Sequence, residues 1–384
     1  MDITGIICEY NPLHLGHKKQ FDKIKSLYPD TGIVCLMSGN YVQRGAPAII
    51  DKSLRAKAAI LSGADLVLEL PITASLSSAE GFASEGVRIL GGFCHRLCFG
   101  TESADTDTLL TTAQALISTD FPEHLRAELD KGVSFPVARQ AALQAMGVQK
   151  DTLSHPNDIL ATEYCKAILQ QQTTMEPMPI IREGNYHDTT IDPENPSATA
   201  LRISMGQDTS WMDFIPEAAI DTLAGAELHT LSAGEQAILY RLRTMTDEEF
   251  EALPYGSEGL WRKLMHNARR YATLEEIISA TKSKRYTRTR LDRMIMCAFL
   301  GITQKDLDSP APYTRVLAFN NKGREILKIA RETGQFPNAG ETVDSLYQAL
   351  EYQAGSLYSL FSNKQENPYD EGDRRVFYKS GGAV

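Results

Sequence analysis

Two histidines near the start of the chain, His14 and His17, carry the clearest chemical signal in the sequence. They follow a short apolar run at residues 3–8 and an Asn-Pro turn, and Gly16 stands between them. A strand that turns into a helix places both imidazoles at a helix N-terminus, where unpaired N–H groups and the helix dipole attract phosphate. Imidazoles can donate hydrogen bonds to phosphate oxygens as charge builds up in a transition state. The segment therefore predicts a site for chemistry at phosphate that needs donors rather than a covalent nucleophile.

The context of the two histidines separates this interpretation from two plainer ones. A His-x-x-His pair often arises by chance, and it can also be half of a metal site. Here the pair opens a helix after the first strand of an alternating α/β pattern. In that setting His14-Leu15-Gly16-His17 resembles the HxGH nucleotidyltransferases. The resemblance implies a nucleotidyltransferase fold and attack by the substrate at the α-phosphate of ATP.

A second segment, Ser197-Ala198-Thr199-Ala200-Leu201-Arg202, resembles the adenylyltransferase pattern Ser-Ser-Thr-x-x-Arg. Ala198 departs from the pattern, so one hydroxyl is missing. We expect Ser197 and Thr199 to face the β- and γ-phosphates of ATP from a helix start, and Arg202 to neutralise the departing diphosphate. The alternative is an ordinary capped helix that follows Pro196.

Further stretches resemble the family of bacterial tRNA(Met) cytidine acetate ligases. They cover residues 5–12, 38–45, 63–71, 99–102, 156–161 and 181–184. The likeness extends over roughly the full length and is strongest in the first half. It implies that acetate is joined to N4 of the wobble cytidine of elongator tRNA(Met), while ATP is split to AMP and diphosphate through an acetyl-adenylate.

The same resemblance implies which residues contact the nucleotide. They are Ile7, Cys8, Glu9, Tyr10, Asn11, Pro12, Leu13, His14, Leu15, Gly16, His17, Lys18, Lys19, Gln20, Gly100, Asn157, Arg182 and Glu183. Among them His14 and His17 form the catalytic pair. We expect Mg²⁺ to arrive with ATP, because this ion keeps several waters and binds substrate phosphates, and we expect no metal site of the protein's own.

Two of these positions also have plainer interpretations. Asn157, near an expected helix start, can hydrogen-bond a nucleotide through its amide or simply cap the helix. Arg182 follows an apolar strand and can reach phosphates or stack on adenine, or it can pair with a neighbour such as Glu183. The sequence leaves these alternatives open.

A polar loop at residues 38–45 follows the second expected strand and supplies the substrate candidates. Asn40, Gln43 and Arg44 can hold a small carboxylate such as acetate, or a cytosine that has been taken out of its stack. The alternative is an ordinary polar turn, and the sequence alone does not decide between the two.

Strands and helices alternate along the first half, which predicts an α/β fold with a doubly wound parallel sheet. Expected strands cover residues 3–8, 32–37, 66–70, 96–100 and 177–182, with helices at 15–27, 51–61 and 79–90. Beyond about residue 206 the apolar spacing becomes helical, with a short strand near 315–319 and a loose polar end of about twenty residues. We therefore expect a nucleotidyltransferase-like, ATP-binding catalytic domain at 1–205 and a mainly helical, tRNA-binding domain at 206–384.

The helical domain contains a strongly basic segment at residues 262–293. This segment contains ten Lys and Arg residues and three Asp and Glu residues, so its net charge is +7 in a chain whose formal net charge is −10. The densest cations are Lys282, Lys284, Arg285, Arg288 and Arg290. We expect them to contact tRNA phosphates, with Tyr286 available for stacking. The alternative is a solvated helix face paired with acids elsewhere.

Composition limits the remaining possibilities. No run of about 18 apolar residues predicts a membrane span, and the first residues lack the pattern of a signal peptide, so we expect a cytoplasmic protein. The scattered positions of the six cysteines predict free thiols in a reducing compartment. The sequence gives no sign of an obligate protein partner. A net charge of −10 argues against general nucleic-acid binding over the whole surface.

Two other functions share parts of this pattern. A small-molecule adenylyltransferase would use the same motif but would have no need of a large helical domain. A non-catalytic RNA-binding protein with a decayed nucleotide fold would have no reason to keep His14, Gly16 and His17 together. The acetate ligase therefore accounts for more of the chain than either alternative.

Overall fold

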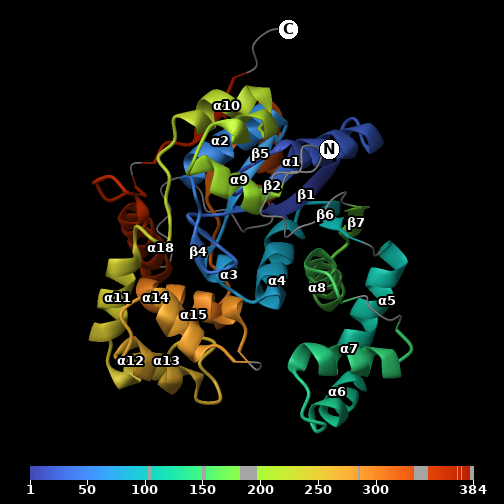
Figure 1. Cartoon of the computed structure of the whole chain (residues 1–384). Coiled ribbons are helices and arrows are strands. Elements are labelled where there is room, and N and C mark those ends of the chain that lie inside the picture. Colours follow the sequence, from blue (N-terminus) through green and yellow to red (C-terminus); the bar gives the residue numbers. More distant parts are fainter. Residues whose placement is uncertain are drawn as a thin grey trace.

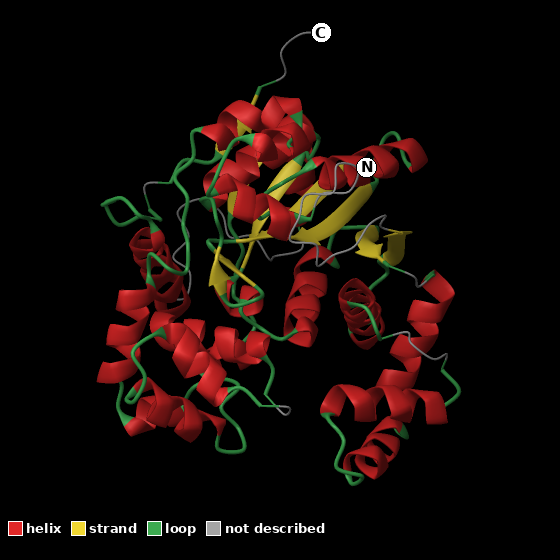
Figure 2. Cartoon of the chain, in the orientation of Figure 1, coloured by secondary structure: helices red, strands yellow, loops and turns green. Residues whose placement is uncertain are grey.

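A seven-stranded sheet forms the centre of the molecule in the computed structural model, and helices cover both of its faces (Figure 1, Figure 2). The structure describes residues 1–102, 105–148, 153–181, 197–283, 286–332, 345–369, 371–372 and 374–380. From one edge to the other the strands are β7 (Glu176–Ile181), β6 (Arg96–Thr101), β1 (Ile3–Cys8), β2 (Gly32–Ser38), β5 (Leu66–Leu70), β8 (Val316–Asn320) and β9 (Phe377–Lys379). A separate hairpin consists of β3 (Tyr41–Val42) and β4 (Ala46–Pro47).

Most neighbouring strands of the sheet are parallel. From β7 to β5 every pair has this sense, whereas β8 pairs antiparallel with β5 and β9 runs parallel to β8. The strands β2 and β5 are buried throughout, as expected for parallel strands covered on both faces. The chain passes from β1 to β2 and β5 on one side, then crosses to β6 and β7 on the other. The doubly wound α/β fold is confirmed, and its topological switch point lies between β1 and β6.

The helices divide between the two faces of the sheet. One face is covered by α1 (Leu15–Leu27) and α2 (Lys52–Ser62). The other face is covered by α4 (Ala79–Leu90), α8 (Pro156–Gln170) and α17 (Asn321–Arg331). Three elements pack outside α2, namely α9 (Ala198–Met205), the 3-10 helix η1 (Ser210–Phe214) and α10 (Glu217–Ala224). An arm extends from α8 (Figure 1) and consists of α5 (Thr106–Ile117), α6 (Phe121–Leu129) and α7 (Phe135–Ala145).

A second apolar core lies in the helical part of the chain beyond residue 230 (Figure 1). Its elements are α11 (Glu235–Thr244), α12 (Asp247–Glu251), α13 (Leu260–Ala268), α14 (Leu274–Thr281), α15 (Arg288–Leu300), α16 (Gln304–Asp308), α18 (Ser345–Tyr358) and the 3-10 helix η2 (Ser359–Phe361). Tyr41 of the hairpin and Ile72 of the short helix α3 (Ile72–Ser75) belong to the same core. The helical part therefore packs directly against the loops that follow β2 and β5. Within the described ranges, every helix is too short or too polar to span a membrane.

Two strands differ from the expectation from sequence. The short strand expected near 315–319 does not interrupt the helical domain, because β8 joins the main sheet beside β5. The polar end of the chain is not wholly loose, since β9 pairs with β8. Neither short segment contains a local signal for its partner, which lies far away in the sequence. The division at residues 205 and 206 stays a prediction, but strands from beyond it complete the sheet.

Candidate functional site

The chain brings its chemical groups together at the switch point between β1 and β6. Open α/β sheets bind ligands here, at the carboxyl ends of the strands, because the loops on the two sides lead away in opposite directions. On one side β1 leads through the Asn-Pro turn to α1, and on the other β6 leads to Glu102 and faces the start of α8. Ile7 and Cys8 end β1, and Gly100 lies near the end of β6.

The two histidines are fixed by hydrogen bonds to the start of their own helix. His14 is the N-cap of α1, and its Nδ1 accepts a hydrogen bond from the backbone N–H of Gly16 at 3.1 Å. His17 Nδ1 accepts one from the backbone N–H of His14, also at 3.1 Å. A ring nitrogen that accepts a hydrogen bond carries no proton, so both rings are neutral and hold their proton on Nε2. Each imidazole is thereby set as a donor.

The packing of the rings explains why the residue between them is glycine. The two ring centroids are 3.9 Å apart, and Tyr10 meets His17 edge-on at 4.8 Å. His14 is 2 % exposed. A Cβ at position 16 would lie 2.8 Å from Cε1 of His14, which is closer than real Cβ atoms approach. Gly16 is therefore required for the His14 ring to fold back onto the helix start, besides leaving room for a ligand near the backbone.

The second motif contacts the first through the side chain of Arg202. Arg202 Nη1 donates to the carbonyl oxygen of Asn11 at 2.7 Å, and its Nη2 donates to Oγ1 of Thr199 at 3.0 Å. Ser197 caps α9 by accepting from the backbone N–H of Ala200 at 3.0 Å. The helix start of α9 is thus attached to the Asn-Pro turn, and its role toward phosphate stays a prediction.

The remaining positions of the first motif support the turn or lie at its edge. Asn11 Oδ1 accepts from the backbone N–H of Ile49 at 2.8 Å, while Pro12 and Leu13 are buried. Gln20 Nε2 lies 3.4 Å from Sγ of Cys98 on β6, which ties α1 to the neighbouring strand. Leu15, Lys18 and Lys19 lie on the outer part of the helix start. Lys18 forms an ion pair with Asp22.

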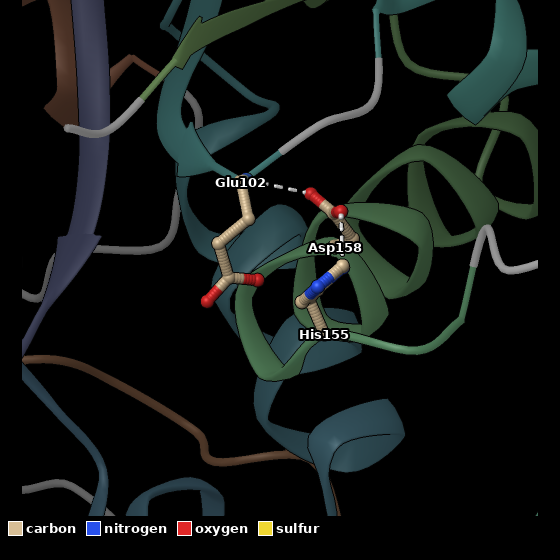
Figure 3. Close-up of side chains that lie close together, drawn as sticks. All are labelled: Glu102, His155 and Asp158. Carbon is tan, nitrogen blue, oxygen red and sulfur yellow. Dashed lines mark hydrogen bonds and ion pairs between the residues drawn. The ribbon is translucent and has the colours of Figure 1, made fainter. Parts of the chain in front are cut away.

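On the β6 side, Glu102 is a candidate that the sequence analysis did not single out. Its carboxylate accepts from Asn157 at the start of α8, and its own N–H donates to Asp158 (Figure 3). The signal that could have found it is an acidic residue directly after a strand that ends at the ligand edge. Arg182 and Glu183, the other expected contacts on this side, lie outside the described residues.

Glu102, His155 and Asp158 form the one group in the described part of the chain with the residue types and proximity of a metal site (Figure 3). Their ligand atoms lie within 4.8 Å of one another. Both carboxylates, however, already accept N–H bonds at the N-terminus of α8, whose positive dipole end opposes a cation. The His155 side chain is 52 % exposed. The arrangement suits a helix cap better than a metal centre.

Arg55 of α2 is a second residue that sequence reasoning missed. Its guanidinium is fully buried and donates to the carbonyl oxygens of Ile50 at 2.8 Å, Glu9 at 2.6 Å and Ser38 at 3.1 Å, and also to that of Gly39. Burial lowers the pKa of Arg55. One side chain therefore joins the carboxyl ends of β1 and β2. Arginines on helices are usually exposed, so nothing in the sequence marks this one.

The loop at residues 38–45 lies beside the first motif, but its side chains are not equally available. Asn40 is buried, and its amide is used by the start of α2: Nδ2 donates to Asp51 at 3.1 Å and Oδ1 accepts from the N–H of Lys52 at 2.8 Å. The backbone N–H of Gln43 donates to Oε1 of Glu9 at 2.7 Å. Asn40 therefore supports the loop, and the side chain of Gln43 donates through Nε2 to the carbonyl oxygen of Ser77 at 3.3 Å. The roles of Asn40, Gln43 and Arg44 toward a substrate stay predictions.

The basic segment is partly neutralised by acids of its own region. Arg288 pairs with Glu275 at 2.8 Å and with Asp292 at 2.9 Å. Arg290 donates to the carbonyl oxygen of Tyr255 at 2.7 Å. Lys282 is exposed at the end of α14, whereas Lys284 and Arg285 lie outside the described residues.

Comparison with known proteins gives the same assignment along the whole chain. The model of the HIGH Nucleotidyl Transferase family matches residues 1–373. The tRNA(Met) cytidine acetate ligase of Clostridium novyi is 37 % identical over 390 residues, which cover 96 % of this chain and 97 % of the relative. The tRNA(Met) cytidine acetate ligase of Clostridium acetobutylicum is 35 % identical over 402 residues, which cover 98 % of this chain and 99 % of the relative.

Solved structures agree with the sequence relatives. The apo crystal structure of Thermotoga maritima TmcAL superposes with a TM-score of 0.92 at 29 % identity, over 99 % of this chain and all of that one. The same protein bound with alpha-thio ATP gives a TM-score of 0.87 at 28 % identity, with the same coverage. The chain therefore belongs to the HIGH nucleotidyl transferases and to the family of tRNA(Met) cytidine acetate ligases.

Proposed function

We propose that this protein is an ATP-dependent ligase that activates acetate as acetyl-adenylate and transfers the acetyl group to N4 of the wobble cytidine of elongator tRNA(Met). The observation that supports this most directly is the pair of neutral imidazoles at the N-terminus of α1. The names of the full-length relatives supply the substrates. The protein would act in the cytoplasm, where tRNA, ATP and acetate meet.

The first step needs donors at the phosphates rather than a nucleophile from the protein. An acetate oxygen attacks the α-phosphorus of ATP, the bond between that phosphorus and the bridging oxygen breaks, and diphosphate leaves. Negative charge grows on the phosphate oxygens in the transition state, where the Nε2–H groups of His14 and His17 can stabilise it together with the helix N-terminus. In the second step the amine N4 of cytidine attacks the acetyl carbon, AMP leaves, and the amine loses a proton.

The cysteines support an adenylate over an acyl-enzyme. Burial raises the pKa of the Cys98 and Cys165 thiols to about 12, and it also raises those of Cys8 and Cys94. A thiol with a raised pKa carries little thiolate and is a poor nucleophile. An acetyl group would therefore be activated on ATP.

Mg²⁺ enters this proposal as a companion of ATP. The one described cluster with suitable donors, around Glu102 and Asp158, is engaged in N–H bonds and lies at the positive end of α8. A magnesium ion usually keeps several waters and binds mainly through substrate phosphates. When bound, it would neutralise phosphate charge, and the protein's own donors would position the α-phosphate.

The activation step can be tested with isotope-labelled acetate. Purified protein is incubated with ATP, oxygen-18-labelled acetate and tRNA(Met), and both AMP and free phosphate are examined by mass spectrometry. We expect the label in AMP. Label in free phosphate would indicate an acyl-phosphate route instead. Diphosphate release with nicotinamide mononucleotide or phosphopantetheine, but not with acetate, would favour a small-molecule adenylyltransferase.

We propose that the basic segment at residues 262–293 binds tRNA. The ion pairs of Arg288 provide a control for testing this proposal. Replacing Lys282, Lys284 and Arg285 by alanine should weaken tRNA binding and flatten its dependence on salt, because fewer counterions are released. Arg288→Ala is the matched control, since its charge is already paired with Glu275 and Asp292. Acetyl-adenylate formation without tRNA should be unchanged in both. Equal tRNA affinity of the triple variant and the wild type across a salt titration would move the tRNA site toward the loop at 38–45.

Acetate itself is expected at that loop. Gln43 and Arg44 lie in the turn between β3 and β4, where the backbone N–H of Gln43 donates to Glu9 of the first motif, and a guanidinium is well suited to a carboxylate. Arg44→Gln should raise the KM for acetate more than the KM for ATP. An unchanged KM for acetate would exclude this side chain as the carboxylate partner.

A further inference from the structure

Glu102 and Asn157 are joined by a pair of hydrogen bonds across the switch point. The side-chain amide of Asn157 donates through Nδ2 to Oε1 of Glu102 at 2.7 Å, and its backbone N–H donates to Oε2 at 3.1 Å. In return, the backbone N–H of Glu102 donates to Oδ1 of Asp158 at 2.8 Å (Figure 3). Both oxygens of one carboxylate therefore hold one residue, which fixes the rotamer of Asn157 as well as the helix start.

This pairing also determines which atom of the Asn157 carboxamide points away from Glu102. An ionised carboxylate only accepts hydrogen bonds, so the NH₂ group has to face Glu102 and the carbonyl oxygen Oδ1 has to point away. Within the described part of the chain Oδ1 accepts no hydrogen bond, and the residue is half-buried. Asn157 thus offers an acceptor, held in one orientation, at the carboxyl end of the sheet.

The position of this acceptor indicates which part of a nucleotide it meets. The phosphates of ATP belong at the N-terminus of α1, beside His14 and His17, on the β1 side of the switch point. Asn157 lies on the other side, at the start of α8 and beside the end of β6. The nucleoside part of ATP extends from the phosphates, and its hydrogen-bond donors are the exocyclic amine of adenine and the two ribose hydroxyls.

We propose that Glu102 is a positioning residue that orients the amide of Asn157, so that Oδ1 accepts a hydrogen bond from a donor on the nucleoside part of ATP. This inference rests on the proposed use of ATP. It predicts that Glu102 acts on nucleotide affinity through Asn157 and does not itself touch the reacting atoms. A carboxylate that merely caps α8 would affect stability and leave nucleotide binding unchanged.

The test uses two single variants and their combination in the full-length protein. In Glu102→Gln a carboxamide faces the Asn157 amide, and in Asn157→Asp two carboxylates face each other, so each single variant breaks the pair. The double variant restores it with the donor and acceptor exchanged: the NH₂ of the new glutamine can donate to the new aspartate, which again presents an oxygen. The net charge of the double variant equals that of the wild type.

The Kd for ATP is measured by calorimetry, with thermal unfolding of each variant in parallel. We expect each single variant to bind ATP about tenfold more weakly, the effect of one lost hydrogen bond of about 1.4 kcal/mol, and the double variant to recover to within about threefold of the wild type. A loss of thermal stability with unchanged Kd in the single variants would overturn the inference. Absence of ATP binding by the wild type would instead contradict the proposed function.

Nucleotide analogues identify the donor and do not depend on the folding of the Glu102 variants. Asn157→Ala keeps the backbone N–H that caps α8 but removes the carboxamide, and it should also bind ATP about tenfold more weakly. Purine riboside triphosphate, which lacks the exocyclic amine, and the 2′- and 3′-deoxy forms of ATP are then compared in wild type and Asn157→Ala. The analogue that lacks the contacted donor should bind both proteins equally. If the Asn157→Ala variant weakened all three analogues as much as ATP, Oδ1 would not be the recognition atom.

Discussion

The molecule holds two dense polar regions that differ in how their groups are paired. At the switch point, Nδ1 of His14 and Nδ1 of His17 each accept a hydrogen bond from a backbone N–H at the start of α1, and the Asn157 amide pairs with Glu102. Around the carboxyl end of β5 lies a buried charge cluster, in which acidic and basic side chains pair with one another. Its members are Asp51, Lys52, Glu69, Arg315, Glu351, Glu371 and Arg374.

The buried charge cluster connects five separate parts of the chain. Lys52 of α2 pairs with Glu69 at 2.6 Å and with Glu371 at 2.8 Å, and its side chain is 2 % exposed. Arg315 reaches Glu69 at 3.0 Å and Glu351 at 3.2 Å. These groups form ion pairs with one another, and Lys52, Glu69 and Glu371 also line a pocket beside Asn40. The comparison teaches that the histidines are positioned by the start of their own helix, whereas the cluster holds together segments that lie far apart in the sequence.

The largest effect is expected from a break in the buried charge cluster. Lys52→Met leaves the carboxylates of Glu69 and Glu371 with one cation fewer in a buried site, and removal of one partner of such a pair costs about 3–5 kcal/mol of the free energy of unfolding. The loss of unfolding free energy is measured by urea denaturation. Lys328→Met, whose exposed pair with Glu325 contributes about 0–1 kcal/mol, is the control. Equal stability of the two variants would mean that the cluster is not the structural element described here.

At the switch point the expected effect is on rate rather than stability. His17→Ala and His14→Ala should each lower the rate of acetyl-adenylate formation by about 10²–10³-fold while changing the Kd for ATP much less, because each removes a donor to transition-state charge. His14→Ala should also lose about 1 kcal/mol of stability, since that ring caps α1. Exposed His266→Ala serves as the control. Near-native turnover of both variants would remove the histidines from the mechanism.

The loop at 38–45 contacts both regions, through Gln43 and Asn40, and Gly45 packs it against α15 of the helical part. This glycine has φ +78°, and a Cβ there would lie 2.4 Å from the backbone of Asp292 and Arg293 on α15. Gly45→Ala should lower the unfolding free energy by about 2–4 kcal/mol, from the left-handed conformation together with overpacking. Gly132 has φ +77° with nothing within 4 Å, so Gly132→Ala isolates the conformational part at about 1–2 kcal/mol. Equal losses in the two variants would show that the loop can move away from α15.

The smallest effect is expected from Glu351→Gln, and it should depend on pH. Burial and the neighbouring charge of Glu69 raise the pKa of Glu351. A raised folded-state pKa contributes stability below the unfolded value of about 4.3, and this contribution is lost as the pH rises through the folded value. Glutamine does not titrate, so the variant should gain stability relative to the wild type between pH 4 and pH 8. A difference that does not change with pH would mean that Glu351 is ionised throughout this range.

The local part of the site could be predicted from the sequence because its groups are neighbours in the chain. The strand, turn and helix around His14 and His17 lie within residues 3–27, and apolar runs and helix-start signals are enough to place them. The hydrogen bond from Arg202 to the carbonyl oxygen of Asn11 in that turn was not predicted, because the two residues are 191 positions apart.

The buried charge cluster could not be predicted in this way. Arg374 pairs with Asp51 across 323 residues, and nothing beside either residue names its partner. Arg55 illustrates the same limit, because an arginine on a helix with an apolar face gives no sign that its guanidinium turns inward to four carbonyl groups. Sequence patterns report local periodicity, whereas these contacts are set by the fold as a whole.

The sheet edge formed by β8 and β9 has a consequence for the timing of folding. Ribosomes add roughly 5–20 residues per second, so the 255 residues between Asp65, just before β5, and Asn320, at the end of β8, take roughly 13 to 51 seconds to synthesise. During that interval β5 lacks the strand that pairs with it on one side. An open strand edge of apolar sequence is a template for aggregation. The nascent chain therefore passes through a period of tens of seconds in which the edge of β5 is open to misfolding, and this period ends when β8 emerges and pairs with β5.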